Sequence, residues 1–443
     1  MAGERFSRTA WVLAVLAFAA GVGLTLGQAA DQGRQFQGLA GARSESQRGR
    51  APSLAPAAIR SSKLTVRMDR IGRAPSIGNL GSPVVAGNRL IFIDQGGSLD
   101  AWDGTSSRPL LTDSTLPPDL NLIGPEAVLN AAANSTGSRL YVMFTSSTVP
   151  GGIPQRLSPR AGTDAWQVLY GFDFDGTELS NPRAITALQF RSDGHSGGGL
   201  TMAGDNTLIF ATGDNGDSGE DGRAFTQDAT NHLGKLVRIN VSTGATDVVA
   251  IGMRNVQRLI IDANGGDPHL IAVDIGGWIA EEVDAIPLDV LLSGSARPNC
   301  GWGRHPVDGK AREGTFYIDA NGAAVGDAPL EPGFVQPIAQ FGREHAQAIG
   351  ATGPVASTRS FRLIRYLFGD LVSGSAYALA SAPTKAPQVV FHVALVDSAR
   401  RPVTLLELAG GTRADPRFFN FPDGTAGVLL ESTGEFYRLT EIR

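Results

Sequence analysis

The chain has 443 residues, of which 56 are glycine, 25 are proline and one is cysteine, and its formal net charge is −5. Glycine makes up about an eighth of the chain, against roughly 7% in average proteins, but it follows no G-X-Y period, which excludes a collagen-like fold. The hydrophobic fraction of 42% excludes a wholly disordered chain, and the acidic balance argues against nucleic acid as a partner. A single cysteine excludes disulfides within the chain and cysteine-rich metal sites. So many turns in a large globular chain favour β-structure.

The N-terminus has the pattern of an export signal. Two arginines precede an apolar run over residues 10–26, and small residues follow it. This arrangement predicts a secretory signal peptide over residues 1–30, or an uncleaved membrane anchor through the apolar run. Residues 31–75 are polar and rich in Arg, Gln, Ser and Ala, so we predict a linker there. The rest of the chain would then work outside the cytoplasm, in the periplasm or secreted.

One unit recurs along residues 76–443. A short run of β-branched or aromatic residues is followed by glycine-containing turn residues and a second alternating run, which is the pattern of a β-hairpin. The six copies lie in residues 89–104, 139–176, 207–244, 269–288, 364–380 and 427–442. Repeats on this scale are typical of a β-propeller, in which each four-stranded blade needs its neighbours to bury both faces. We therefore predict an all-β, six-bladed β-propeller over residues 76–443; a pair of β-sandwiches or a β-helix is the alternative.

The residues that can do chemistry lie in the turns between these strands. His195, in the stretch RSDGHSGGGL, could serve as a general base or be a turn residue without a role. The next loop carries hard oxygen ligands for Ca²⁺ but lacks the EF-hand spacing, so a solvated acidic loop is the alternative. These acids are Asp214, Asp217, Glu220 and Asp221. A second acidic group surrounds a Gly-Gly turn and is equally compatible with a metal site or a structural turn. It comprises Asp274, Glu281, Glu282 and Asp284.

The order of the motifs is more specific than any one of them. H-S-G-G-G-L, T-G-D-x-G, G-K-L-V-R-I-N, G-M-R-N-x-Q, D-x-G-G…E-E-V-D and N-C-G-W-G follow one another between His195 and Trp302. In this order they resemble the glucose/sorbosone dehydrogenase family. The resemblance implies a six-bladed propeller that uses pyrroloquinoline quinone (PQQ), and it runs from about Arg89 to Arg443.

The resemblance also implies roles for particular residues. His195 would be the general base that takes the proton from a sugar's anomeric hydroxyl while a hydride passes to PQQ, with Arg254 acting beside it. Further contacts to the cofactor would come from Asn255, Gln257, Lys385, Arg413 and Arg417, the last three as cations for its carboxylates. Ca²⁺ would be held by the loop that contains Gly276, Gly277, Glu281 and Glu282, partly through backbone carbonyls.

Two departures from the family bear on this reading. Glu281-Glu282 stands where the family usually has Asp-Glu, and the stretch around Arg417 is out of register with the family's R-x-R-D pattern. We predict an exported quinoprotein that oxidises an aldose-type sugar to its lactone and passes the electrons to an unidentified acceptor. The alternatives are a catalytically silent propeller that binds a glycan or a protein in the cell envelope, and a Ca²⁺-dependent, lactonase-like hydrolase.

Overall fold

The computed structural model describes residues 59–112, 115–159, 165–191, 194–216, 220–264, 266–305, 308–328, 332–343, 349 and 352–442. The chain divides into two compact units, residues 1–53 and 54–443, and all of the described residues belong to the second unit. The predicted signal segment, residues 1–30, and residues 31–58 of the predicted linker lie outside the described residues. Among the helices that the structure does describe, none is long and apolar enough to cross a membrane.

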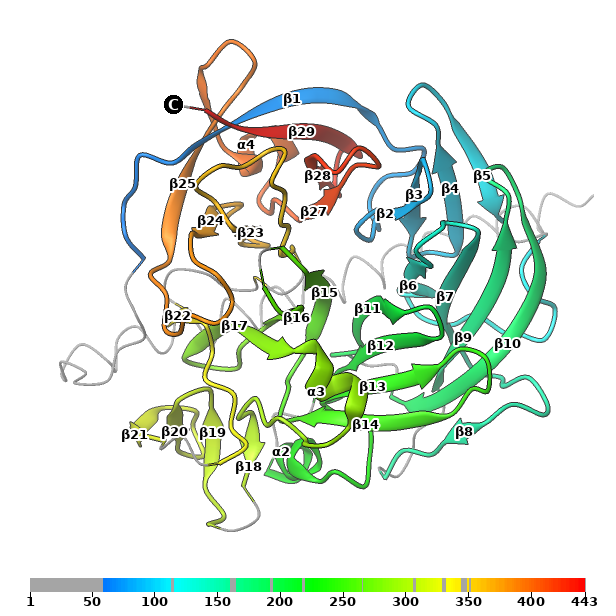
Figure 1. The fold of residues 1–443 in the computed structure, drawn as a ribbon, viewed down its shortest axis with the longest axis vertical. Coiled ribbons are helices and arrows are strands. Elements are labelled where there is room, and N and C mark those ends of the chain that lie inside the picture. The colour runs from blue at the N-terminus through cyan, green and yellow to red at the C-terminus, as the bar shows by residue number, and fades with distance from the viewer. Residues whose placement is uncertain are drawn as a thin grey trace, which may run out of the picture. The chain divides into compact units, whose positions relative to one another are not determined.

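Strands of the second unit form six blades around a common centre, and the first strand of each blade lies nearest that centre (Figure 1). Blade 1 comprises β2 (Val84–Ala86), β3 (Arg89–Asp94), β4 (Ser98–Trp102) and β5 (Ser107–Leu111). Blade 2 comprises β6 (Val128–Ala133), β7 (Arg139–Ser146), β9 (Ala165–Phe174) and β10 (Leu179–Phe190), with the short β8 (Gln155–Arg156) beside β10. Blade 3 comprises β11 (Gly197–Gly204), β12 (Thr207–Thr212), β13 (Lys235–Asn240) and β14 (Thr246–Ile251).

The second half of the ring follows the same plan. Blade 4 comprises β15 (Val256–Asp262), β16 (His269–Asp274), β17 (Ala280–Pro287) and β22 (Ala339–Gly342). Blade 5 comprises β23 (Tyr366–Gly369), β24 (Ala376–Leu379), β25 (Phe391–Val396) and the short β26 (Pro402–Val403). Blade 6 comprises β27 (Pro416–Asn420), β28 (Ala426–Leu430), β29 (Glu435–Ile442) and β1 (Thr65–Arg73). Each of the six predicted hairpins lies in its own blade, so the six-bladed all-β propeller is confirmed.

A separate apolar cluster fills each contact between neighbouring blades. The second strands of blades 1 to 4 are almost continuously apolar, as expected for strands buried on both faces. Five clusters join blades 1 to 6 in chain order. A sixth cluster joins blade 6 back to blade 1, where the rings of Phe92 and Phe436 lie 5.2 Å apart. Both faces of every blade are therefore covered only when the ring is closed.

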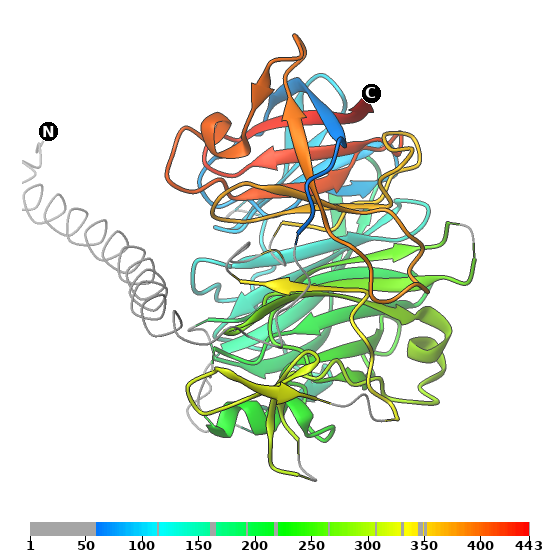
Figure 2. The same cartoon turned by 90° about the vertical axis from the view of Figure 1, so that its left-hand side faces the viewer.

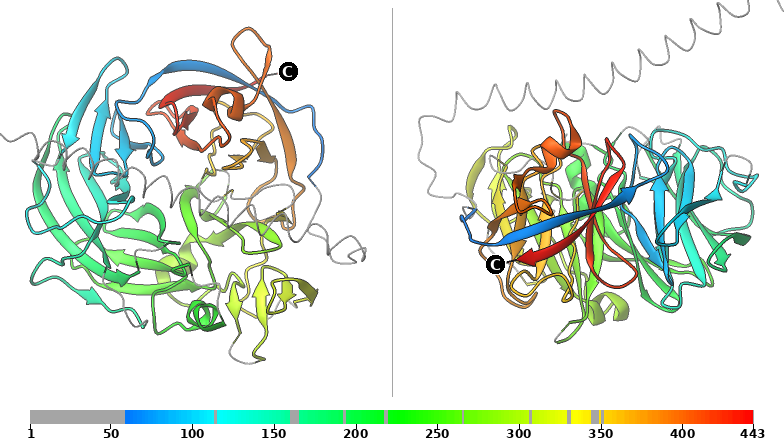
Figure 3. Two further views of the ribbon diagram at one scale, coloured as in Figure 1. Left: turned by 180° about the vertical axis from the view of Figure 1, so that it is seen from behind. Right: turned by 90° about the horizontal axis from the view of Figure 1, so that it is seen from above.

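The ring is closed by β1, the first strand of the described chain. It pairs antiparallel with β29, the last strand, from Thr65 opposite Ile442 to Arg73 opposite Glu435, and its start also pairs parallel with β25 (Figures 1 and 3). The sequence analysis assigned these residues to the linker over 31–75, which was wrong for residues 65–73. The alternating side chains of Val66 and Met68 are buried in blade 6, and the polar residues between them face outward, so the polar composition concealed a strand.

Blade 4 carries an insertion that the sequence analysis did not predict. Between β17 and β22 the chain forms α3 (Leu288–Ser293) and a small sheet of β18 (Gly303–Arg304), β19 (Ala311–Glu313), β20 (Phe316–Ile318) and β21 (Ala324–Asp327). This sheet lies beside α2 (Glu220–Gln227) of blade 3, as Figure 2 shows. The remaining helix, α4 (Leu405–Ala409), begins at a capping box of Thr404 and Glu407 and precedes β27. Through this sheet, the insertion of blade 4 contacts α2 of blade 3.

Removal of β1 should destabilise the whole ring. A chain that begins after Arg73 would lose the buried side chains of Val66 and Met68, worth about 1.5–3 kcal/mol each, and would leave β29 as an unpaired edge. We expect a lower midpoint of thermal unfolding and aggregation of the truncated protein, measured by circular dichroism and size-exclusion chromatography. A chain that begins at residue 59 keeps β1 and is the matched control. Equal midpoints for the two chains would contradict this account of ring closure.

Candidate functional site

Loops from neighbouring ends of blades 3 and 4 bring the candidate residues together. His195 lies in the connection that enters β11, and Asp214 follows β12 directly. The imidazole Nδ1 of His195 lies 2.7 Å from Asp214 Oδ1. The buried carboxylate therefore accepts the Nδ1 proton of a neutral imidazole, which leaves a lone pair on Nε2. Burial alone would raise the pKa of Asp214, but the facing imidazole and the Arg254 guanidinium hold that pKa below its ordinary value.

Tight backbone turns set the direction of this histidine. His195 itself has a φ of 47°, in the left-handed region that few side-chain-bearing residues occupy. Its carbonyl oxygen lies so close to Gly213 that a Cβ there would be 1.5 Å away. Glycine is therefore required at Gly213. The motif H-S-G-G-G-L, which contains His195, thus meets the motif T-G-D-x-G, which contains Gly213. Together they hold the imidazole in place.

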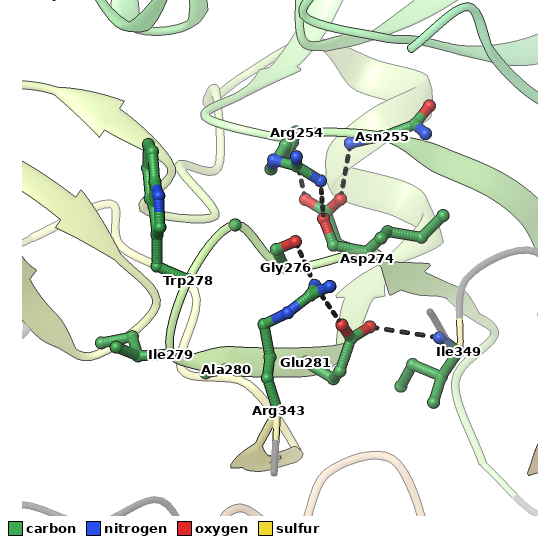
Figure 4. Close-up of polar contacts among 12 residues, drawn as sticks. Arg254, Asn255, Asp274, Gly276, Trp278, Ile279, Ala280, Glu281, Arg343 and Ile349 are labelled. Carbon is green, nitrogen blue, oxygen red and sulfur yellow. Dashed lines mark hydrogen bonds and ion pairs between the residues drawn. The ribbon is translucent and has the colours of Figure 1, made fainter. Parts of the chain in front are cut away.

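The backbone of Arg254 and Asn255 is held by the carboxylate of Asp274, at the end of β16 (Figure 4). The two oxygens of Asp274 each accept one backbone N–H, from Arg254 and from Asn255, both at 2.7 Å. Burial raises the pKa of Asp274 to about 6, although the two backbone donors and the Arg254 guanidinium oppose this. Asp274 was predicted as part of an acidic group; the structure places it as the support of Arg254.

The guanidinium of Arg254 lies against His195. Its Nη2 is 3.2 Å from His195 Nε2, and its Nη1 donates to the carbonyl of Ile275 at 3.0 Å. Its Cζ lies 5.4 Å from the ring centroid of Trp302, whose indole N–H donates to Asp214 Oδ2 at 3.1 Å. Asp214, His195, Arg254 and Trp302 therefore form one connected group, and the two predicted catalytic residues are in direct contact.

Glu313 of the insertion fixes the loop between β16 and β17. Its carboxylate accepts the consecutive backbone N–H groups of residues 277–280, at 2.8 to 3.1 Å. The ring of Trp278 in this loop stacks on Trp302, with centroids 5.6 Å apart and an interplanar angle of 23°. Four amide donors that would suit an external anion are thus already satisfied by the protein's own carboxylate.

The four predicted calcium ligands do not converge on one point. Arg343 Nη1 donates both to the carbonyl of Gly276 and to Glu281 Oε1, the latter at 2.5 Å (Figure 4). The N–H of Gly277 is taken by Glu313. Glu281 and Glu282 are neighbours in β17, so their side chains point to opposite faces of the blade. Among the described residues, no three His, Cys, Asp or Glu side chains are grouped as a metal would require.

Glu282 instead belongs to a buried acidic cluster inside blade 4. Asp274 is its cross-strand partner in β16, and Asp284 lies on the same face of β17. Neither carboxyl oxygen of Asp284 has a nitrogen or oxygen donor among the described residues; the Cys300 thiol is its polar neighbour. Burial, and then the neighbouring carboxyl groups, raise the pKa values of Glu282 and Asp284 well above the ordinary range. Of the earlier acidic loop, Asp217, with residues 218 and 219, lies outside the described residues.

The five predicted cofactor contacts form two groups, three in the C-terminal part of the chain and two beside Arg254. Lys385 is exposed in the connection from β24 to β25, and Arg413 is exposed and donates to Asp415 at 2.7 Å. Arg417 is buried on β27, where it donates to the carbonyl of Leu80 and pairs with Glu431. The other two predicted contacts lie beside Arg254. Asn255 Oδ1 accepts the N–H of Gly197 at 3.1 Å, and Gln257 is half-buried on β15.

A second arginine near Arg417 escaped the sequence analysis. Arg258 follows Gln257 on β15, the innermost strand of blade 4, and Arg417 lies on the innermost strand of blade 6. Burial, with the positive charge of Arg417, lowers the pKa of Arg258 well below its ordinary value. Arg258 Nε and Arg417 Nη1 have no hydrogen-bond partner among the residues that the structure describes. Two buried donors of like charge are thus left available at the centre of the ring.

Comparison with known proteins agrees with this arrangement. Residues 128–341, a little under half of the chain, match the family model described as glucose/sorbosone dehydrogenase. The resemblance to the glucose/sorbosone dehydrogenase family is confirmed. The matched range begins with β6 and ends within β22, so it contains blades 2 to 4, and with them His195, Arg254 and the insertion.

Solved structures of the family share the fold. The PQQ-bound aldose sugar dehydrogenase of Streptomyces coelicolor is 18% identical, with a TM-score of 0.54 over 88% of this chain and 100% of that one. A putative oxidoreductase (glucose dehydrogenase) of Thermus thermophilus is 15% identical, with a TM-score of 0.53 over 86% and 100%. A family AA12 carbohydrate-active enzyme of Trichoderma reesei is 14% identical, with a TM-score of 0.55 over 89% and 100%. At these identities the likeness concerns the fold.

Several members of the site were missed because no local pattern marks them. Arg343 and Glu313 are single charged residues in segments without a motif, and only the folded chain brings them to the Gly276 loop. Trp302, in N-C-G-W-G, was given no role of its own; its indole N–H donates to Asp214 and positions that carboxylate. The one sequence feature that could have indicated these residues is the placement of charged residues among apolar ones in A-R-E (residues 311–313) and A-Q-F-G-R (residues 339–343).

The acidic cluster of blade 4 should make stability depend on pH. A carboxyl whose pKa is raised in the folded state holds a proton that the unfolded chain releases, so its contribution is lost as pH rises through the folded pKa. For Asp274 and Glu281 this loss spans the interval from their ordinary values of 3.8 and 4.5 to about 6 and about 7. The midpoint of thermal unfolding should therefore fall between about pH 4 and pH 7.

Asp284→Asn tests this expectation. The amide cannot ionise, so its variant should lose less stability at high pH and unfold about 2–4 °C above the wild type at pH 8, measured by scanning calorimetry. Asp289→Asn, at an exposed acid on α3, is the matched control and should follow the wild-type pH profile. Parallel profiles for wild type and Asp284→Asn would show that this carboxyl does not carry the pH dependence.

Proposed function

We propose that the protein is a quinoprotein sugar dehydrogenase that oxidises an aldose-type sugar to its lactone, with His195 as the general base. The observation that carries the proposal is the Asp214–His195–Arg254 group, in which two residues that the family resemblance marks as catalytic are in contact and oriented by buried carboxylates. Export, from the pattern of residues 10–26, and an electron acceptor of unknown identity complete the proposal.

Residues suited to an anionic cofactor are present at the centre of the ring. PQQ carries carboxylates, and the unpartnered N–H groups of Arg258 and Arg417 are donors that a carboxylate can accept from. These two arginines, with Arg254, would hold the cofactor. Bound PQQ would supply the hydride acceptor. The residues expected to hold Ca²⁺ do not fit the ion, because Arg343 already occupies the carbonyl of Gly276 and the carboxylate of Glu281.

The protein's own groups account for the proton transfer. His195 Nε2 carries the lone pair that would take the proton of the anomeric hydroxyl. Asp214 would keep the imidazole in the required tautomer and stabilise the imidazolium once it forms. Arg254 Nη2 donates to the same Nε2, so a bound hydroxyl must replace this contact, and the displaced guanidinium would then face the reacting oxygen. Asp274 would keep the Arg254 backbone in place through this change.

The contact between Arg254 and His195 also favours a second candidate, a propeller that binds a glycan or a protein without turnover. In that case Nε2 stays occupied and the paired charges have a purely structural role. A titration with PQQ, followed by absorbance, separates the two candidates. Saturable binding, together with reduction of an artificial electron acceptor across a panel of aldoses, supports the dehydrogenase. No binding and no turnover would support the binding module.

His195→Asn should remove turnover and leave the fold intact. Asparagine tolerates the left-handed backbone of this position but provides no base, so the rate should fall by about 10²–10⁴-fold. The free energy of unfolding should fall by about 1–3 kcal/mol, because buried Asp214 loses one of its two side-chain partners and keeps Trp302. Steady-state assays and thermal unfolding measure both quantities. His392→Asn, at an exposed histidine of blade 5, is the matched control. Retained activity in His195→Asn would refute the assignment of the base.

Asp214→Asn should give a different signature. The amide can no longer fix the Nδ1–H tautomer or stabilise the imidazolium, so turnover should fall by about two to four orders of magnitude. Because the carboxylate does not contact substrate in this account, PQQ binding should change little. A rate and a cofactor affinity that fall together would instead place Asp214 in cofactor binding.

A further inference from the structure

Arg343 occupies an unusual position at the edge of blade 4. It follows β22 directly, and its own N–H donates to the carbonyl of Ile279 at 3.2 Å, which ties it to the Gly276 loop. From there the side chain runs inward and is only 14% exposed. Figure 4 shows its guanidinium lying between the carbonyl of Gly276 and the carboxylate of Glu281. A single nitrogen, Nη1, donates to both oxygens.

The two oxygens that Arg343 bridges are suited to bind a cation. Glu281 is fully buried, and its second oxygen accepts the N–H of Ile349 at 3.2 Å. The loop is closed so tightly that a Cβ on Gly276 would lie 1.4 Å from the carbonyl of Ala280, so no other residue could present this carbonyl in the same way. A backbone carbonyl facing a carboxylate is a hard oxygen pair of the kind that Ca²⁺ prefers.

The pair cannot hold the guanidinium and a divalent ion at the same time. Nη1 of Arg343 is already bonded to Glu281 Oε1, so a divalent ion would have to displace the guanidinium from this carboxyl group. No further carboxylate joins from β17, because Glu282 points to the opposite face. Arg254 adds a second positive charge nearby. Burial, and also the positive charge of Arg343, lower the pKa of Arg254. A divalent ion in contact with Glu281 would therefore meet two guanidinium groups, that of Arg343 bonded to this carboxylate and that of Arg254 near it.

We propose that the guanidinium of Arg343 takes the place of a divalent cation at the Gly276 loop, so that the protein binds no Ca²⁺ there. Resting on the proposed function, the inference extends to the cofactor, which the protein would hold without Ca²⁺ by means of Arg254, Arg258 and Arg417. The first part concerns only this chain and the ion. It can be tested whether or not the protein is a dehydrogenase.

The test compares wild type with Arg343→Ala and Arg343→Lys. Calcium chloride alone is titrated into each purified, full-length protein by calorimetry, and thermal midpoints are measured with Ca²⁺ and with EDTA. We expect no saturable heat and no shift of the midpoint for wild type. In Arg343→Ala the Gly276 carbonyl and Glu281 are freed, so Ca²⁺ should bind with a dissociation constant of about 0.1–1 mM and raise the midpoint. Arg343→Lys keeps a cation and should respond less than Arg343→Ala.

The calcium titration of the wild type tests the proposal even when Arg343→Ala does not fold. Saturable binding of Ca²⁺ to wild type that Glu281→Gln abolishes would overturn the proposal. A titration of wild type with PQQ, in EDTA and in Ca²⁺, tests the second part. Equal affinities support it, and an affinity at least tenfold higher in Ca²⁺ overturns it. Absence of PQQ binding in both conditions would reject the proposed function, while the Ca²⁺ titrations would still stand as the test of Arg343.

Discussion

Each blade of this protein has two apolar faces, and only another blade can cover each face. This constraint makes the structure a ring of mutually dependent parts, in which six apolar clusters alternate with six blades. It also explains why the first and last described strands pair with each other, since a ring assembled from a linear chain has one junction without a covalent connection. The candidate site depends on the same closure, because Arg258 and Arg417 come from innermost strands of non-neighbouring blades.

Within this frame, the site is a set of buried charges, most of which are matched by a partner. Asp214 is matched by His195 and Trp302, Asp274 by two backbone amides, Glu313 by four, and Glu281 by Arg343. Burial makes each of these pairings expensive to break, so the loops that carry them are held firmly even though they lie between strands. The exceptions are informative. Among the described residues, Arg258 and Arg417 retain donors without partners, and Nε2 of His195 contacts the guanidinium of Arg254.

The sequence was sufficient to predict the propeller and its six hairpins and to single out His195 and Arg254, because these depend on local turn chemistry and on motifs in a specific order. It was insufficient where a role arises from long-range packing. The strand β1 looked like a linker because only alternate residues, Val66 and Met68, are buried, and its partner β29 lies at the far end of the chain. The calcium loop was inferred from Gly276, Gly277, Glu281 and Glu282 together. Strand alternation separates Glu281 from Glu282, and a distant arginine takes the remaining oxygens. Lys385 and Arg413 were inferred from the family resemblance as cations of the last blades, and both are exposed.

The insertion of blade 4 has a consequence for how this fold can vary. Its Glu313 enters the loop between β16 and β17 and accepts four consecutive amide N–H groups, while Trp302 from the same segment donates to Asp214. The insertion at the edge of blade 4 therefore fixes the loop between β16 and β17 of the same blade. Any attempt to transplant this site into another propeller, or to shorten this one, must carry residues 288–338 along with the blades, because Glu313 of this segment fixes the loop together with the loop's own Gly276.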